Sequence, residues 1–377
     1  MTTAAVIITL LYALAMLFLL YGFFQVPKFS GKNSASKTHF SIVIPYRNEA
    51  ENLPLLFNSL LKLNYPPKMF EILAVNDASE DTSEELWQKF RKEHPQLNLR
   101  LLNNVRTSGS PKKDAISLAI SASDYDFIVT TDADCVVPQE WLKNFNSAIE
   151  GTAAKAIAGP VALKTEGSKM SFLRGFQEME ILSLQAATIG GFGVDLPFMC
   201  NGANFCYSKK AFMEVGGFEG NHEFAGGDDI FLLEKFRQKG LKPIFLKSPE
   251  AIVQTSATKS WSGLFSQRVR WAAKAAAYKS TFSKGVGLIV FLMNFSLVLA
   301  TPGTIANALP AWLLSFMFLI KFNVDFLLIY NSAKFFGRKQ AVKSYFFNSI
   351  LYPFFSSMVV FYSLFSGFNW KGRQFKK

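Results

Sequence analysis

Cysteine is scarce in this 377-residue chain, which contains three: Cys135, Cys200 and Cys206. An odd count without the spacing of a disulfide framework indicates a reducing compartment, so we expect the polar part of the chain to face the cytosol. A G-x-G-x-x-G turn is also missing, and together with the long apolar runs this excludes a soluble dinucleotide-binding module. The sequence has neither internal repeats nor low-complexity tracts.

Charge is absent from the first long apolar run, Ala4 to Phe24. A bilayer core of about 30 Å needs about 20 helical residues, so this run is long enough to span it. No basic segment precedes the run and no small-x-small cleavage site follows it. We therefore predict a retained transmembrane anchor over residues 1–26 in place of a cleaved signal peptide.

Two further regions lack charge, Val286 to Ile320 and Tyr345 to Phe368. We predict two transmembrane helices within 286–330. For 345–369 we expect a transmembrane or a re-entrant segment, because Pro353 leaves both possibilities open. Within the second predicted helix, Lys321 and Asp325 stand four residues apart and are expected to pair with each other.

The net charge of +12 is spread along the chain, and no compact nucleic-acid motif is present. We expect no nucleic acid as a partner and instead attraction to anionic lipid heads, at about 1 kcal/mol per well-placed Lys or Arg. Basic residues after the first anchor and in the tail, 370–377, favour the inner side of the membrane. We therefore predict a multi-pass protein of the cell (inner) membrane whose catalytic domain is cytoplasmic.

Between the anchor and Gly285, short β-branched runs alternate with stretches of helical periodicity. The runs end near Pro45, Val75, Leu102 and Thr130. This alternation predicts an α/β domain over 38–257 with a mostly parallel sheet and right-handed crossovers. In such sheets, ligands bind at the carboxyl ends of the strands.

Aspartates stand at these strand ends. Asp77 follows one strand, and Asp132 and Asp134 follow another. Residues i and i+2 of an extended segment point the same way, and two carboxylates on one side suit Mg²⁺ or Mn²⁺. Alternatively, Asp77 makes only an Asx-turn, and the D-x-D pair is a solvated turn with Asp134 as a helix cap.

Two motifs follow downstream. In "GGDDIFLLEKFRQKG", either Asp228 or Asp229 suffices as a helix cap, so one of the two carboxylates is left as a candidate general base. In "QRVRW", Gln267, Arg270 and Trp271 lie at i, i+3 and i+4, which places them on one face of a helix. A guanidinium beside an amide and an indole suits a diphosphate and a sugar ring. The composition of 258–285 also fits a helix lying at a membrane interface.

The order of these motifs resembles the membrane-bound branch of glycosyltransferase family 2, which includes cellulose, hyaluronan and chitin synthases and ceramide glucosyltransferases. "IPYRNEAENL", "NGANFCYSKKAFMEVGGF" and "NWKGRQF" are similar to that family as well. The resemblance covers roughly residues 38 to 275. It implies a GT-A-type, Rossmann-like nucleotide-sugar domain, joined here to transmembrane and interfacial helices.

The resemblance also implies roles for single residues. Asp77 would bind the nucleotide base, and Pro45, Arg47 and Glu49 would line the nucleotide pocket. The segment that often has the pattern G-K-x-x-A-L-N is "PKKDAIS" in this chain, which leaves open whether the first or the second lysine approaches the donor.

Asp132 and Asp134 would hold Mg²⁺ or Mn²⁺, with Asp132 also contacting the donor. Asp229 would be the catalytic base, and Arg270 would stabilise the leaving diphosphate. Gln267 and Trp271 would help to bind the diphosphate and the acceptor.

The expected activity is metal-dependent, inverting transfer of a hexose from a nucleoside-diphosphate sugar, with uridine diphosphate sugars favoured, to a lipid or lipid-linked hydroxyl. Two alternatives remain open: a processive polysaccharide synthase, and a non-catalytic membrane scaffold with a decayed transferase domain. The small number of apolar regions favours transfer of a single sugar, and the intact set of aspartates favours an enzyme.

Overall fold

The computed structural model of the chain describes residues 2–31, 35–165, 171–224, 226–275, 277–365, 368–370 and 373–375. The chain divides into two compact units. The sheet unit comprises Pro27–Lys164 and Met199–Ser256, and the helical unit comprises Met1–Val26, Thr165–Phe198 and Ala257–Lys377. Lys371, Lys376 and Lys377 of the predicted basic tail lie outside the described residues.

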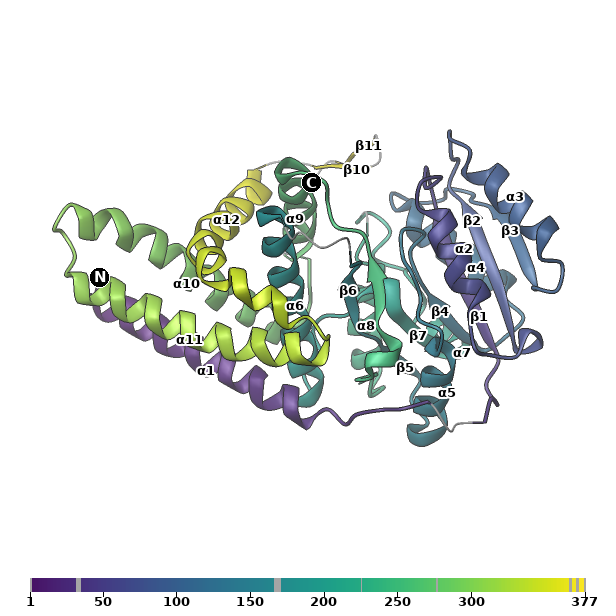
Figure 1. The fold of residues 1–377 in the computed structure, drawn as a ribbon, viewed down its shortest axis with the longest axis horizontal. Helices are drawn as coiled ribbons and strands as arrows, with labels where there is room; N and C mark the ends of the chain where they lie inside the picture. Colours follow the sequence, from purple (N-terminus) through teal and green to yellow (C-terminus); the bar gives the residue numbers. More distant parts are fainter. Residues whose placement is uncertain are drawn as a thin grey trace. The chain divides into compact units, whose positions relative to one another are not determined.

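The sheet unit contains a seven-stranded sheet in the order β3-β2-β1-β4-β7-β5-β8 (Figure 1). Its strands are β1 (Phe40–Tyr46), β2 (Phe70–Asn76), β3 (Leu99–Asn103), β4 (Phe127–Thr130), β5 (Ala156–Ala158), β7 (Phe205–Ser208) and β8 (Ile244–Phe245). Strands β1 to β4 pair in parallel, while β7 runs antiparallel to both β4 and β5. The four strand runs expected from the sequence all appear, and the predicted mostly parallel sheet is confirmed.

Helices alternate with these strands along the chain. They are α2 (Leu53–Leu61), α3 (Ser83–Glu93), α4 (Pro111–Ala122), α5 (Trp141–Thr152), α7 (Lys209–Glu214) and α8 (Asp228–Gln238). A small parallel pair, β6 (Val161–Leu163) with β9 (Val253–Thr255), completes the unit together with the short 3-10 helices Pro67–Met69, Gly202–Asn204 and Pro249–Ala251. Consecutive residues Ile42, Val43 and Ile44 of β1 are all fully buried, so helices cover both faces of the sheet.

The helical unit is built from helices, most of them long and apolar. They are α1 (Thr2–Gln25), α6 (Phe172–Gly193), α9 (Trp261–Ala275), α10 (Thr281–Ile305), α11 (Ala311–Phe335) and α12 (Tyr345–Phe365), with the 3-10 turn Lys339–Ser344 before α12 and a hairpin of β10 (Phe368–Trp370) and β11 (Arg373–Phe375) after it. Helix α12 passes through Pro353 without a break.

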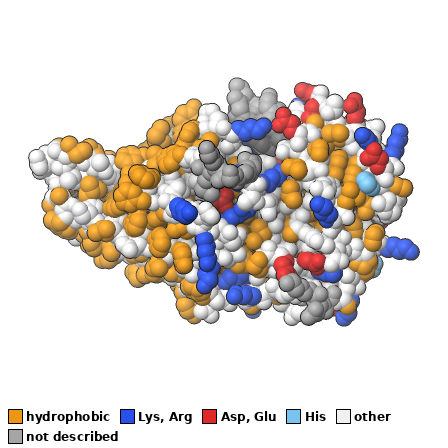
Figure 2. All heavy atoms as spheres, in the orientation of Figure 1, with side chains coloured by type: hydrophobic (Ala, Val, Ile, Leu, Met, Phe, Trp, Pro, Cys, Tyr) orange, Lys and Arg blue, Asp and Glu red, His pale blue; other side chains and the backbone are white. Residues whose placement is uncertain are grey.

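Among the described residues, four helical stretches are long and apolar enough to cross a membrane: Thr2–Gln25, Thr281–Ile305, Ala311–Phe335 and Lys339–Phe365. Many of their large apolar side chains are exposed, for example Leu14 at 65% and Phe347 at 66%. Figure 2 shows hydrophobic side chains gathered over the helices of this unit. Such a continuous apolar surface is atypical of a protein in water and marks a surface for membrane or protein contact.

Helix α6 departs from the expected boundaries. It lies inside the stretch predicted as the catalytic domain, 38–257, but it packs with α1 and α11 in the helical unit. Glycines allow this close approach: a Cβ added to Gly190 would lie 2.2 Å from the carbonyl oxygen of Leu19, and one added to Gly22 would lie 2.1 Å from the carbonyl oxygen of Gly190. Small residues that let two backbones touch are typical of packed apolar helices.

Candidate active site

An acidic turn follows β4. Oxygens of Asp132 and Asp134 and the sulfur of Cys135 all lie within 4.8 Å of one another. The backbone here is a turn and not the extended segment expected from the sequence, because the Cys135 amide donates to the Asp132 carbonyl (3.1 Å). The two carboxylates still share one side of the chain, which is the property that a divalent cation requires.

Asp134 is held by one residue of a strand and by its own neighbour in the turn. Its Oδ2 accepts a hydrogen bond from Thr255 of β9 (3.2 Å), and its Oδ1 faces the Cys135 thiol at 3.5 Å. Burial, together with the carboxylates of Asp132 and Glu49, raises the pKa of Asp134 to about 6. A carboxylate whose charge is costly in the unliganded protein gains from a bound cation, which compensates for burial and for the neighbouring negative charges.

Lys112 joins this turn to the start of α8. Its ammonium group lies 2.7 Å from Asp132 Oδ1 and 3.2 Å from Asp228 Oδ2. Burial disfavours the charge of this lysine, but the carboxylates of Asp132 and Asp228 outweigh that effect and raise its pKa. Asp132 and Asp228, which are far apart in sequence, therefore meet across one cation.

The adjacent Lys113 points elsewhere. It is fully buried and donates to the carbonyl oxygens of Asn221 (2.6 Å) and Phe224 (3.0 Å). Burial lowers the pKa of Lys113 to about 8. Of the two lysines that the sequence left open, Lys112 is the one placed among the site carboxylates.

Helix α8 presents two aspartates at its start. The N-cap is Gly227, so Asp228 and Asp229 are the first residues of the helix and neither is the cap. Gly226 and Gly227 have φ values of +80° and +70°, a region that side-chain-bearing residues rarely adopt. These glycines turn the chain so that the helix starts with two carboxylates, one more than a cap requires, and Asp228 reaches Lys112, which also contacts Asp132 of the acidic turn.

Asp229 is positioned by backbone amides. Its Oδ2 accepts a hydrogen bond from the amide of Gly202 (3.0 Å), and its Oδ1 accepts one from Ile230 (2.8 Å). Burial and the carboxylate of Asp228 raise its pKa. Gly202 comes from the "NGANF" segment, and a Cβ at this position would lie 2.8 Å from Asp228 Oδ2, so only glycine fits without displacing that carboxylate.

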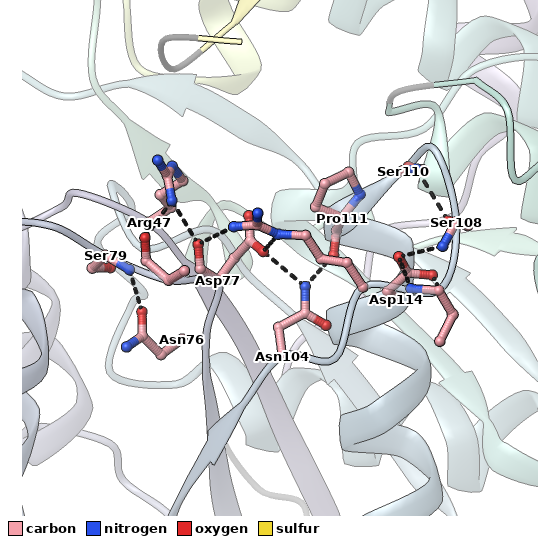
Figure 3. A network of polar contacts seen from close by, with 12 residues as sticks. Arg47, Asn76, Asp77, Ser79, Asn104, Ser108, Ser110, Pro111 and Asp114 are labelled. Carbon is pink, nitrogen blue, oxygen red and sulfur yellow. Dashed lines mark hydrogen bonds and ion pairs between the residues drawn. The ribbon is translucent and has the colours of Figure 1, made fainter.

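Asp77 lies in a second polar network, at the end of β2. Its Oδ1 accepts hydrogen bonds from Asn104 Nδ2 (2.9 Å) and Arg106 Nε (2.7 Å). Figure 3 shows this carboxylate facing Asn104, with Arg47 on the other side reaching the backbone. The turn bond expected of Asp77 is made by Asn76, whose Oδ1 accepts from the Ser79 amide (2.9 Å), while Asp77 orders the loop that follows β3.

The other residues expected at the nucleotide pocket lie in β1 or in the loop that follows it. Arg47 donates to the carbonyl oxygens of Asp77 (3.0 Å) and Ala78 and pairs with Glu80 (2.8 Å). Pro45 is in β1, opposite Val75 of β2. Glu49 accepts a hydrogen bond from Asn52 (2.7 Å) and contributes to the raised pKa of Asp134, so it lies toward the acidic turn.

Gln267, Arg270 and Trp271 lie on α9, which belongs to the helical unit. The site residues described above belong to the sheet unit. The neighbour Arg268 on α9 is not among the residues predicted for the site. It pairs with Glu180 of α6 (2.8 Å), donates to Gln267 and stacks 4.2 Å from the centre of the Trp271 ring. Arg268 thereby fixes two of the three predicted residues to α6.

The donor set fits a hard divalent cation. Two carboxylates within reach of each other, one of them with a raised pKa, provide the oxygen ligands that Mg²⁺ and Mn²⁺ prefer. Cys135 does not belong to that set, because burial and the carboxylates of Asp134 and Asp132 raise the pKa of its thiol well above its usual value. A neutral thiol is a poor ligand for a hard cation.

The fold matches a solved nucleotide-sugar enzyme. The mannosyltransferase PcManGT from Pyrobaculum calidifontis, solved in complex with GDP-Man and Mn2+, superimposes with a TM-score of 0.62, covering 93% of this chain and 98% of that one at 16% identity. This likeness concerns the fold, and it confirms the GT-A-type architecture expected from the sequence. The chain therefore has a GT-A-type α/β fold.

Comparison with protein-family models identifies the family of the sheet-containing part of the chain. Residues 41–216 match the model of Glycosyl transferase family 2, so the chain carries a domain of that family and the resemblance predicted from its motifs is confirmed. The chain is 28% identical over 121 residues to the glycosyltransferase AglE of Haloferax volcanii, which is 32% of this chain and 38% of AglE.

Two staphylococcal proteins are also similar. The poly-beta-1,6-N-acetyl-D-glucosamine synthase of Staphylococcus aureus is 26% identical over 234 residues, or 60% of this chain and 52% of the synthase. The poly(ribitol-phosphate) beta-N-acetylglucosaminyltransferase TarS of the same organism is 30% identical over 111 residues, 29% of this chain and 19% of TarS. The matched segments thus span between about a fifth and a half of these relatives.

Proposed function

We propose that the chain is a membrane-bound, metal-dependent, inverting glycosyltransferase that moves one sugar from a nucleoside-diphosphate sugar to the hydroxyl of a lipid or lipid-linked acceptor. One observation carries this proposal: on a family 2 domain, the turn holding Asp132 and Asp134 meets the start of α8, with Asp228 and Asp229, through Lys112. Mg²⁺ or Mn²⁺ at Asp132 and Asp134 would supply positive charge to the diphosphate when bound.

The proposed reaction is a single displacement. Asp229 removes the proton of the acceptor hydroxyl as that oxygen forms a bond to the anomeric carbon, and the bond from that carbon to the diphosphate breaks with its electron pair leaving on the nucleoside diphosphate. The raised pKa of Asp229 suits a base, because a more basic carboxylate accepts a proton more readily near neutral pH. Asp77 would bind the nucleotide base, and Arg270 would stabilise the leaving diphosphate.

A lipid acceptor is supported by the helical unit. The part of the chain that the structure describes contains four helical stretches long and apolar enough to cross a membrane, which a soluble acceptor would not require. We infer a multi-pass protein whose sheet unit is cytoplasmic, in keeping with three scattered cysteines that form no disulfide among the described residues. Uridine diphosphate sugars remain the favoured donors; the solved neighbour contains GDP-Man, so guanosine diphosphate sugars belong in the test.

The direct test is a donor screen with the full-length protein in detergent. Uridine and guanosine diphosphate sugars are incubated with membrane lipids, with Mn²⁺ or with a chelator, and released nucleoside diphosphate and labelled lipid are measured. The proposal expects one donor to give metal-dependent release together with a labelled lipid. Release that continues in the chelator, or the absence of release with every donor, would contradict it.

A second candidate is a processive polysaccharide synthase, which the similarity to the staphylococcal poly-N-acetylglucosamine synthase favours. The two candidates differ in product length. A radiolabelled donor would give a lipid with one added sugar under the first proposal and a long, lipid-insoluble polymer under the second. Size separation of the labelled product distinguishes them.

A further inference from the structure

Lys113 is a buried charge that the proposed transfer reaction does not use. It stands in the first turn of α4, directly after Lys112, and its side chain is fully buried. Moving an ammonium group out of water is costly unless strong contacts compensate for the lost hydration. An uncharged side chain would avoid that cost at this position, so the presence of a lysine calls for a functional explanation.

The contacts of Lys113 lie on the chain that leads into α8. Its Nζ donates to the carbonyl oxygens of Asn221 (2.6 Å) and Phe224 (3.0 Å). The same ammonium group lies 4.9 Å from the centre of the Phe231 ring in α8, and the rings of Phe224 and Phe231 are 5.6 Å apart. One side chain therefore holds α8 and the residues before it together, through charge-assisted hydrogen bonds and a cation–π contact.

The chain before α8 has little regular structure to hold it in place. Between α7 and α8, the described residues form turns and neither a helix nor a strand. Gly220, Gly226 and Gly227 have φ values of +75°, +80° and +70°. Glycine loses more conformational freedom on folding than any other residue. We therefore expect outside contacts, and those of Lys113 above all, to limit the movement of the start of α8.

The same turn of α4 is anchored to the predicted nucleotide site. The carbonyl oxygen of Pro111 accepts a hydrogen bond from Asn104 Nδ2 (3.0 Å), and this amide group also donates to Asp77 (2.9 Å), as Figure 3 shows. Lys112 extends from this turn to the acidic turn, whereas Lys113 reaches the chain before α8. The first turn of α4 thus connects the residues expected to bind the donor with the helix that carries the proposed base.

We propose that Lys113 is a positioning residue that holds the start of α8, and with it Asp229, at the place where the acceptor proton is removed. This inference rests on the proposed function, because it takes Asp229 to be the base. A displacement of about 1 Å at a reacting group can lower a rate by about 100-fold. A side chain that contacts neither donor nor acceptor can therefore control turnover by fixing the position of α8.

The first test measures hydrogen exchange of the full-length Lys113→Met variant in detergent, without any sugar donor. Methionine keeps an unbranched apolar side chain and removes the ammonium group. Loss of the two hydrogen bonds should make amides at the start of α8, such as that of Ile230, exchange about tenfold faster than in the wild type. Mass spectrometry of peptides from the start of α8 measures this rate. Because no sugar is transferred, the result is informative even if the proposed function is wrong.

The second test separates positioning from binding. In Lys113→Met, formation of labelled lipid should fall by about 10–100-fold, whereas Mn²⁺-dependent binding of the nucleoside diphosphate should stay within about twofold of the wild type. A role in folding alone would lower both quantities in proportion to the amount of folded protein. If the wild type transferred no sugar from any donor, the proposed function would be contradicted, and the exchange rates alone would decide whether Lys113 holds α8.

Lys235→Met is the matched control. Lys235 also donates to a backbone carbonyl of the chain before α8, but to an earlier one, that of Gly217 (2.7 Å). This variant should leave turnover and the exchange at the start of α8 unchanged.

Lys113→Gln keeps a donor but is too short to reach both carbonyl oxygens. It should change exchange and turnover in the same direction by about threefold, and it decides the matter if Lys113→Met fails to fold. Unchanged exchange and turnover in the folded Lys113 variants, an equal loss of donor binding, or the same changes in Lys235→Met would overturn the proposal.

Discussion

In the helical unit, Lys321 lies against Asp325, and Arg268 lies against Glu180. In the sheet unit, Lys112 faces Asp132 and Asp228 together, with Asp134 and Asp229 close by. The pKa values of Asp134 and Asp229 are raised there, because burial and neighbouring carboxylates outweigh the cations. A buried ion pair with balanced charge needs no further ion. A cluster with more carboxylates than cations is stabilised when a cation binds.

This contrast separates two uses of buried charge in one chain. The acidic cluster of the sheet unit is arranged for a divalent cation and for a base with raised proton affinity. The polar contacts of the helical unit join α1 to α11 and α6 to α9. If this contrast is correct, Mn²⁺ and the sugar donor should change the effect of substitutions in the sheet unit. They should not change the effect of substitutions in the helical unit.

The largest expected effect is on turnover. Asp229→Asn keeps an oxygen for the Gly202 amide but cannot accept the acceptor proton, so turnover should fall by roughly 10²–10⁴-fold while donor binding stays nearly unchanged. The measurement is labelled-lipid formation together with titration of the donor. Asp228→Asn is the matched control, since Asp228 pairs with Lys112. A greater loss of turnover in Asp228→Asn would assign the base to Asp228.

In the helical unit, Lys321→Met should leave Asp325 without its cation inside the apolar bundle. Removing one partner of a buried pair typically costs about 3–5 kcal/mol of the free energy of unfolding. The expected result is a lower unfolding temperature in detergent that Mn²⁺ does not restore. Lys334→Met, on the exposed side of α11, is the control and should have little effect. Restoration by Mn²⁺ would contradict a purely internal pair.

Metal and donor binding give a smaller effect. Asp134→Ala removes one of two carboxylates at the acidic turn, and because loss of a group that only supports a metal ligand already lowers metal affinity by about 10–100-fold, loss of a ligand should lower it at least as much. Mn²⁺-dependent binding of the nucleoside diphosphate should weaken accordingly, which titration calorimetry can measure. Asp124→Ala, whose side chain is 62% exposed and pairs with Arg100, is the control. Equal donor binding in wild type and Asp134→Ala would remove Asp134 from the cation site.

The sequence predicts the sheet well because its strands are continuous apolar runs, and it places aspartates at their ends because parallel strands share one carboxyl edge. It predicts Lys112 less well, since Lys112 and Lys113 are chemically identical and only the start of α4 decides which one faces Asp132. It does not predict Arg106 as a partner of Asp77, because the loop after β3 lacks periodicity.

The helical unit was harder to delimit from the sequence for a related reason. An apolar helix between two polar segments has the same periodicity whether it packs on a sheet or on other helices. Helix α6 therefore fell inside the predicted domain 38–257, although it packs against α1. The signal available was the run of small residues near its end, Gly190, Gly191 and Gly193, which permits a close helix crossing.

Gly190→Ala tests that packing, with the smallest expected effect. The added methyl group would lie 2.2 Å from the Leu19 carbonyl oxygen, so α1 and α6 must move apart, at a cost of about 1–3 kcal/mol in the free energy of unfolding. Gly287→Ala is the control, because nothing lies within 4 Å of its added carbon and alanine favours a helix by about 0.5–1 kcal/mol. Opposite shifts of the unfolding temperature would tie α6 to the helical unit. A shift of Gly190→Ala in the same direction as the control would show that the close contact of α1 with α6 does not exist in the protein.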